Sequence, residues 1–80
     1  MHRYEFAVRD VTCEKCDARI RDAVEGLPGA ARIEYVRTPE DEALVSFESD
    51  EAIPPDAIER AIEAKSAGTE HDYRVRWAAA

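Results

Sequence analysis

Along this chain the spacing of hydrophobic residues switches repeatedly between the period of a strand and that of a helix, and this succession constrains the fold more than any other feature. Residues 4–9 alternate between apolar and polar side chains, which predicts a half-buried strand. From residue 14 the apolar positions recur at helical spacing, until a Leu27-Pro28-Gly29 run ends the helix. This helical stripe consists of Cys16, Ile20, Ala23, Val24 and Leu27.

The rest of the chain repeats these two patterns. Residues 31–37 and 43–48 each alternate, and the short polar turn between them predicts an antiparallel hairpin. Two prolines at 54–55 open a second helix, since proline is tolerated in the first helical turn, and Gly68 suits its C-terminal cap. A last strand is predicted over residues 72–77.

The order strand-helix-strand-strand-helix-strand predicts an α+β fold. Because crossovers between strands are right-handed, we expect a four-stranded antiparallel sheet with both helices on one face and a more polar opposite face. The aromatic residues are expected in the core or the sheet, and we expect one domain over residues 1–80, with a core over 4–77 and a frayed tail at 78–80. The aromatic set is Tyr4, Phe6, Phe47, Tyr73 and Trp77.

The charge balance restricts the partners. Eighteen acidic against eleven basic residues give a net charge of −7, which argues against nucleic acid and anionic membranes as partners. The sequence shows no membrane-spanning stretch and no signal peptide, so we expect a cytoplasmic protein without membrane insertion. Nine of the basic residues are arginine, and this acidic, lysine-poor composition resembles that of proteins from salt-loving organisms, with an ordinary acidic cytosolic domain as the alternative.

Cys13 and Cys16 are the only cysteines, and their spacing indicates a local site rather than a disulfide framework. Cys13 falls in the loop after the first strand and Cys16 in the first helical turn, so both sulfurs can turn toward one point. The helix N-terminus and Lys15 favour the thiolate forms, whereas Glu14 and Asp17 oppose them.

Two thiolates are best suited to a soft cation. A structural Zn²⁺ takes four ligands, hard cations take oxygen, and soft thiolates favour Cu(I). A Cu(I) ion held by two sulfurs keeps an open side, where a partner's cysteine can attack and take over the ion by ligand exchange. The sequence suggests no base–nucleophile pair and no substrate cleft, so we do not expect an enzyme.

In this context the chain resembles the heavy-metal-associated domain family, which includes small copper chaperones and the metal-binding domains of copper-transporting P-type ATPases. The similarity covers about residues 4–77. It implies a ferredoxin-like fold, Cu(I) bound by Cys13 and Cys16, and delivery of the ion to a copper-transporting P-type ATPase or another cysteine-bearing metal acceptor. It rests on Thr12-Cys13-x-x-Cys16, Leu27-Pro28-Gly29, Val45 with Phe47, and Ala61-Ile62-Glu63 through Gly68.

The chain also departs from the family pattern. Asp10 and Val11 stand where the family usually has Gly-Met, and Val11 can replace an inward-pointing methionine. The family often places a Tyr or Lys beside the metal in the loop before the last strand, whereas here Thr69 follows Gly68 and His71 comes shortly after.

Several alternatives remain open from the residues alone. His71 could be a third ligand, although a solvated loop residue is the more frequent case, and Thr12 is expected to hold the loop through backbone hydrogen bonds. The same two cysteines could serve a thiol redox protein or sensor, or carry Zn(II), Hg(II) or Ag(I). We expect a monomer, with a metal-bridged dimer as the alternative.

Two acidic segments complete the sequence. Residues 40–42 form a turn that we expect at the end of the molecule opposite the cysteines. The loop at residues 48–51 is expected at the cysteine end, because the third strand is taken to run parallel to the first. Both are interpreted as solvated acidic loops by default.

Overall fold

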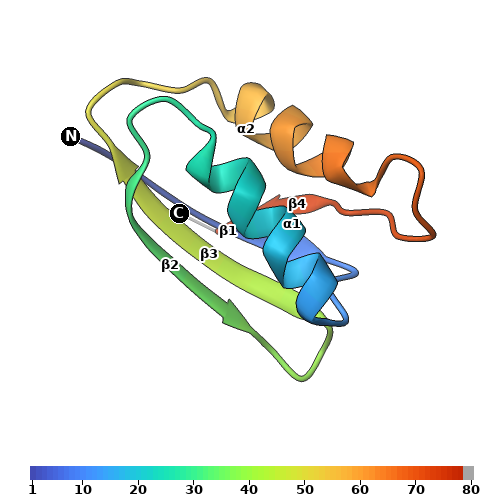
Figure 1. Cartoon of the computed structure of the whole chain (residues 1–80). Coiled ribbons are helices and arrows are strands. Elements are labelled where there is room, and N and C mark those ends of the chain that lie inside the picture. Colours follow the sequence, from blue (N-terminus) through green and yellow to red (C-terminus); the bar gives the residue numbers. More distant parts are fainter. Residues whose placement is uncertain (79–80) are drawn as a thin grey trace.

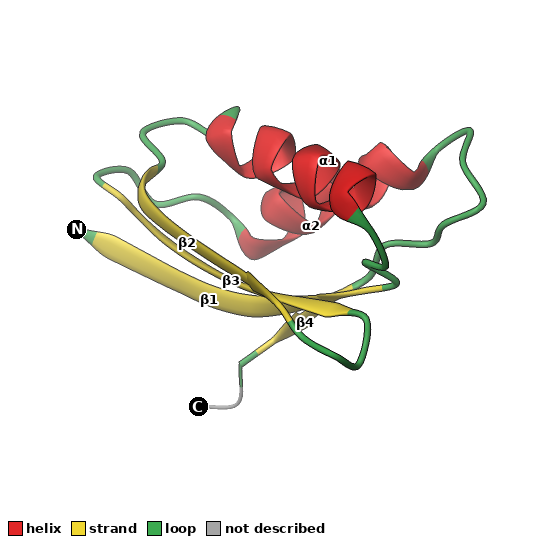
Figure 2. Cartoon of the chain, turned by 60° about the horizontal axis from the view of Figure 1, so that its bottom comes forward, coloured by secondary structure: helices red, strands yellow, loops and turns green. Residues whose placement is uncertain are grey.

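The computed structural model describes residues 1–78 and confirms the predicted fold class. The sheet has the strand order β2-β3-β1-β4, and each pair of neighbouring strands is antiparallel. Both helices lie on one side of the sheet (Figure 1), and the turned view shows the two layers edge-on (Figure 2). The elements are β1 (His2–Arg9), α1 (Glu14–Glu25), β2 (Ala31–Arg37), β3 (Glu42–Ser49), α2 (Pro55–Glu63), the 3₁₀ turn η1 (Ala64–Ser66) and β4 (Val75–Trp77).

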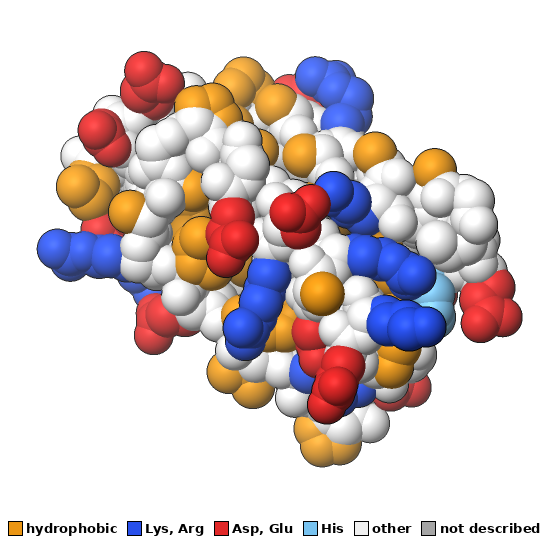
Figure 3. Space-filling model, in the orientation of Figure 1, with side chains coloured by type: hydrophobic (Ala, Val, Ile, Leu, Met, Phe, Trp, Pro, Cys, Tyr) orange, Lys and Arg blue, Asp and Glu red, His pale blue; other side chains and the backbone are white. Residues whose placement is uncertain are grey.

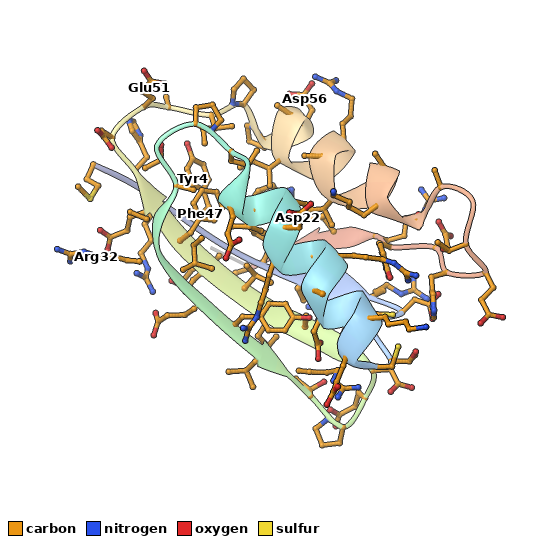
Figure 4. The ribbon with its side chains drawn as sticks, in the orientation of Figure 1. Tyr4, Asp22, Arg32, Phe47, Glu51 and Asp56 are labelled. Carbon is orange, nitrogen blue, oxygen red and sulfur yellow. The ribbon has the colours of Figure 1, made fainter. Side chains whose placement is uncertain are left out.

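The core fills the space between the helices and the sheet. The predicted stripe of α1 is buried at its first four positions, while Leu27 is only partly buried against the core. Tyr4 and Phe47 lie next to each other with ring centroids 5.1 Å apart (Figure 4). Phe6 meets the ring of Trp77 edge-on at 5.2 Å, which joins β4 to β1. The aromatic residues are therefore core and sheet residues, as predicted.

The opposite face of the sheet is less polar than expected at its centre. Val36 and Leu44 face each other across β2 and β3, with 60% and 49% of their surfaces exposed. They line a shallow groove of about 370 Å³ together with charged residues such as Glu5 and Arg76. No helix within residues 1–78 is both long and apolar enough to cross a membrane.

The last strand is shorter than predicted and starts at Val75 rather than residue 72. Its partner β1 ends at Arg9, whose N–H donates to the carbonyl of Arg74. Beyond that point the N–H of Asp72 donates to the side chain of Asp10 at 2.9 Å, so a carboxylate replaces the backbone partner. Ala78 donates to the carbonyl of Glu5 and is thus held by the sheet, and the remainder of the predicted frayed tail lies outside the described residues.

The placement of the two acidic loops was wrong. The crossover through α1 makes β2 parallel to β1, and the hairpin then makes β3 antiparallel to both, so Arg9 pairs with Glu42 and His2 with Ser49. The turn at 40–42 therefore lies at the cysteine end, where Val11 donates to the carbonyl of Asp41 at 3.0 Å. The loop after β3 lies at the far end, where Figure 4 places Glu51.

Candidate metal centre

The two cysteine side chains meet at the N-terminal end of α1. Cys13 is the extended residue that precedes the helix and is exposed, whereas Cys16 lies in the first turn on the buried face. Their sulfurs are 3.7 Å apart, and both cysteines are free thiols. The spacing of the two residues thus brings the sulfurs together as predicted. Cys13 is open to solvent, whereas Cys16 is buried against the core.

The backbone that leads into this loop explains the residue before Val11. Asp10 has a φ of 65°, in the left-handed region that glycine adopts most easily and that Asp tolerates better than most residues. The resemblance places a glycine there, and Asp10 fills the same conformation while adding a carboxylate. Val11 is fully buried in the core, so it replaces the inward-pointing methionine.

The surroundings of Cys16 alter the acidity of its thiol. Burial raises its pKa, but hydrogen bonds from the Tyr73 hydroxyl, from the Thr12 backbone and from Cys13 outweigh burial and lower the pKa from 9.0 to about 7. A substantial fraction of Cys16 is therefore thiolate at neutral pH, which is the form that binds soft metals and attacks disulfides.

Tyr73 is the residue of this site that the sequence interpretation missed, because it was assigned only to the core and sheet. It is fully buried, and its hydroxyl accepts a hydrogen bond from Arg19 Nη1 at 3.0 Å. Burial raises the pKa of Tyr73, so the hydroxyl stays protonated and can donate to the sulfur of Cys16. A usable signal was present: in the sequence Tyr73 alternates with Val75 and Trp77, which predicts that all three side chains point toward the core that also contains Cys16.

We expect Tyr73→Phe to raise the pKa of Cys16, because it removes the strongest of the hydrogen bonds that lower it. The pKa would be read from the ultraviolet absorbance of the thiolate during a pH titration of the Cys13→Ser background. Tyr35→Phe is the matched control, since the hydroxyl of Tyr35 donates to Asp17 rather than to sulfur. An unchanged Cys16 pKa in Tyr73→Phe would contradict the assigned role.

The same shift links the thiol to folding stability. A folded-state pKa below the unfolded value of 9.0 stabilises the fold fully above that pH, and this contribution is lost as the pH falls through about 7. The free energy of unfolding of the wild type should therefore fall between pH 9 and pH 7 relative to Tyr73→Phe, which is measurable by urea unfolding in reducing buffer.

His71 lies against the buried sulfur rather than in solvent. Its Nε2 atom is 3.5 Å from Cys16 Sγ, its Nδ1 atom is 3.3 Å from Asp10 Oδ2, and only 15% of its side chain is exposed. The ring also stacks on Tyr73 with centroids 5.7 Å apart. In the tautomer that carries its hydrogen on Nδ1, this atom can donate to the Asp10 carboxylate, and the Nε2 lone pair then faces the sulfur.

The remaining candidates of the sequence have other roles in the structure. Thr12 Oγ1 is 4.0 Å from Cys16 Sγ, at the limit of a hydrogen bond to sulfur. Thr69 donates to the carbonyl of Ser66 and accepts from the N–H of His71, so it shapes the loop without touching the cysteines. Lys15 lines a groove beside Cys13, and His2 lies at the far end of β1 opposite Ser49.

Two sulfurs with an adjacent imidazole make up the donor set at this end of the molecule. Within residues 1–78, no group of three or more His, Cys, Asp or Glu side chains is arranged to hold a metal ion. The chemistry of this set suits a soft ion that accepts few ligands.

The model of the "Heavy-metal-associated domain" matches residues 5–68, more than half of the chain. The chain belongs to this family. Its members are metal-binding modules, and the matched range includes both cysteines but ends before His71 and Tyr73. No curated protein matches the chain at a significant level.

A solved structure shows the same fold. The solution structure of the yeast copper transporter domain Ccc2a, determined in the apo and Cu(I)-loaded states, aligns with a TM-score of 0.72. The alignment covers 99% of this chain and 97% of the yeast domain, at 18% sequence identity. At this identity the likeness establishes the ferredoxin-like fold of the heavy-metal-associated domain.

Proposed function

We propose that this heavy-metal-associated domain binds Cu(I) through Cys13 and Cys16 and passes the ion to a partner by ligand exchange. The observation that carries the proposal is the 3.7 Å approach of two free thiols, one of which is exposed. Thiolates select soft ions, and Cu(I) accepts coordination by two sulfurs. Family membership supports a heavy metal as cargo, and the similar yeast copper transporter domain was solved in a Cu(I)-loaded state.

The uneven burial of the sulfurs suggests an order for the transfer. A partner's thiolate can reach the ion from the side of Cys13, which is exposed, so Cys13 would be released first. Cys16 is buried and held by neighbouring hydrogen-bond donors, and it would be the last ligand to leave. When the ion enters, the proton of Cys16 can pass to His71 Nε2, which is 3.5 Å away.

We further propose a cytoplasmic chaperone that is a single domain and not an enzyme. Its acceptor would be a copper-transporting P-type ATPase or another protein that offers a cysteine pair. The exposed Cys13 permits an ion to be shared between two molecules, so a metal-bridged dimer can form in addition to the monomer.

A competition titration tests the metal assignment. Under reducing conditions, with chromogenic chelators as competitors, the wild type is expected to bind one Cu(I) per chain and Zn(II) much more weakly. Tight Zn(II) binding together with weak Cu(I) binding would overturn the copper assignment. The same titration with Ag(I) and Hg(II) ranks the other soft ions.

We expect His71→Ala to separate the two metals. Cu(I) is satisfied by two sulfurs, so its affinity should change less than about tenfold, whereas Zn(II) prefers more ligands and should lose about 10- to 100-fold. The measurement is the chelator competition above, with His2→Ala as control because His2 lies at the other end of β1. A large loss of Cu(I) affinity would instead make His71 a ligand of copper.

A thiol redox role is the second candidate, and the low pKa of Cys16 favours it. Two free thiols at 3.7 Å can close a disulfide on a modest movement. A dithiol potential in the range of known disulfide exchangers, combined with electron transfer to a protein partner, would favour this role over copper transport.

A further inference from the structure

A groove opens beside the exposed cysteine and contains more than the thiol pair. Its volume is about 390 Å³, within the range of pockets that hold small molecules. Lys15 and Arg19 line it from α1, one turn apart on the same side of the helix. The opposite wall is the loop before β4, and the lining residues are Cys13, Lys15, Arg19, Gly68, Thr69, Glu70 and His71.

The basic residues of this groove differ from most others in the chain. Within residues 1–78, seven of the eleven Lys and Arg side chains have a carboxylate within 4 Å, namely Arg3, Arg32, Arg37, Arg60, Lys65, Arg74 and Arg76. Neither Lys15 nor Arg19 is among them, and Arg19 donates to the neutral Tyr73 hydroxyl instead. In a chain of net charge −7, two cations without an acidic partner beside one groove form a local attraction for anions.

Two further features strengthen this attraction. The groove borders the N-terminal end of α1, a helix of 12 residues whose first turn has no side-chain cap, so the partial positive charge of the helix adds to that of the two side chains. Figure 3 shows basic side chains gathered around the start of α1 and beside a histidine on this face. Glu70 is the acidic residue among those that line the groove, and Glu14 and Asp17 in the first turn of α1 also oppose the attraction.

We propose that this groove binds a low-molecular-weight thiol that carries carboxylates. Its carboxylates would lie against Lys15 and Arg19, and its sulfur against Cys13. This inference rests on the proposed function, because the sulfur would then occupy the open side of Cu(I), and the ion would reach the protein as the complex of an anionic thiol. Lys15 and Arg19 would thereby select the donor from which the copper comes.

The groove can be tested without metal by thiol–disulfide exchange. The reduced protein reacts with dithiodipropionate, which has one carboxylate per half, or with cystamine, which has one ammonium per half. A cysteine thiolate attacks one sulfur, a protein–probe disulfide forms as the probe's S–S bond breaks, and the other half leaves as a thiolate. Each rate constant is divided by that of mercaptoethanol with the same probe, and the ratio of the two normalised rates measures charge selection.

In Lys15→Gln/Arg19→Gln we expect the anionic-to-cationic ratio to fall by about 5- to 10-fold, since each exposed charge contributes modestly. Arg60→Gln/Lys65→Gln is the matched control, because it removes one Arg and one Lys outside the groove and should leave the ratio within about twofold of the wild type. A loss of thiolate reactivity alone would slow both probes equally. An unchanged ratio in the groove variant would overturn the inference.

A copper arm separates this inference from the proposed function. Cu(I) is offered as its mercaptopropionate or cysteamine complex. The wild type should take up Cu(I) faster from the anionic mercaptopropionate complex, by a factor similar to that of the exchange experiment. The Lys15→Gln/Arg19→Gln variant should lose this preference. If the exchange ratio falls in the groove variant but neither complex loads the wild type with Cu(I), the groove inference is supported and the copper proposal fails. If copper loads from both complexes at equal rates and the exchange ratio does not shift, the groove fails and the copper proposal stands.

Discussion

Replacing Cys13 by serine is expected to abolish tight Cu(I) binding while leaving the fold intact. A hydroxyl is a poor ligand for a soft ion, and one remaining sulfur cannot hold Cu(I) against a chelator. The loss of Cu(I) affinity should therefore exceed the about 10- to 100-fold that is typical when a residue hydrogen-bonded to a metal ligand is replaced. Cys13 is exposed and its side chain meets the core only at Cys16 Sγ, 3.7 Å away. Urea unfolding should therefore change little below pH 7, where the lowered pKa of Cys16 adds nothing to stability. The measurement is Cu(I) competition with a chromogenic chelator in reducing buffer.

Cys16→Ser should lose Cu(I) to the same extent but also lower stability, because it places a hydroxyl in the core. Comparing the two variants separates a ligand effect from a folding effect. Ser46→Ala, on the helix-free face of the sheet, is a control that should bind copper like the wild type. Retention of wild-type Cu(I) affinity in either cysteine variant would rule out the two-sulfur site.

Phe47→Ala is expected to cost about 3–5 kcal/mol of folding free energy, a large share of the about 5–15 kcal/mol that stabilises a typical domain. Phe47 is fully buried on β3, stacked on Tyr4 at 5.1 Å and edge-on to Phe6 at 6.3 Å. Its removal leaves a cavity at the centre of the layer between sheet and helices. A short chain buries little surface, so it has little stability in reserve to offset this loss.

The matched control is Leu44→Ala on the same strand, which faces the opposite side of the sheet with 49% of its surface exposed. We expect it to cost less than about 1 kcal/mol. Both values come from urea unfolding followed by circular dichroism. Equal losses for the two variants would show that the core does not depend on Phe47.

Much of the fold could be predicted because its elements repeat simple periods. The stripe through Cys16, Ile20, Ala23 and Val24 matches the buried face of α1, since 3.6 residues per turn leave few other ways to pair those positions with a sheet. The observed bounds of β2 agree with the predicted ones at both ends. The predicted direction of β3 was wrong, although the predicted crossover and hairpin together determine it: the crossover makes β2 parallel to β1, and the hairpin then reverses β3.

The surroundings of the cysteines were harder to predict, because they depend on contacts between distant segments. Tyr73 and His71 contact Cys16 although they lie 57 and 55 residues away in the sequence, and no local pattern predicts a contact between such distant segments. The partnership of Asp10 with His71 also depends on the left-handed backbone at Asp10, which the sequence reveals only through the glycine that the family usually has there.

The cysteine loop is tied to its neighbours on two sides. Val11 bonds to the turn that joins β2 to β3, and Asp10 accepts a hydrogen bond from the segment that leads into β4. These two hydrogen bonds hold the loop in place, so under the proposed function less conformational entropy would be lost when a metal ion binds. Because Val11 is hydrogen-bonded to the turn at residues 38–42, we expect an insertion in this turn to loosen the cysteine loop. Metal binding would then slow, although no donor atom has been changed.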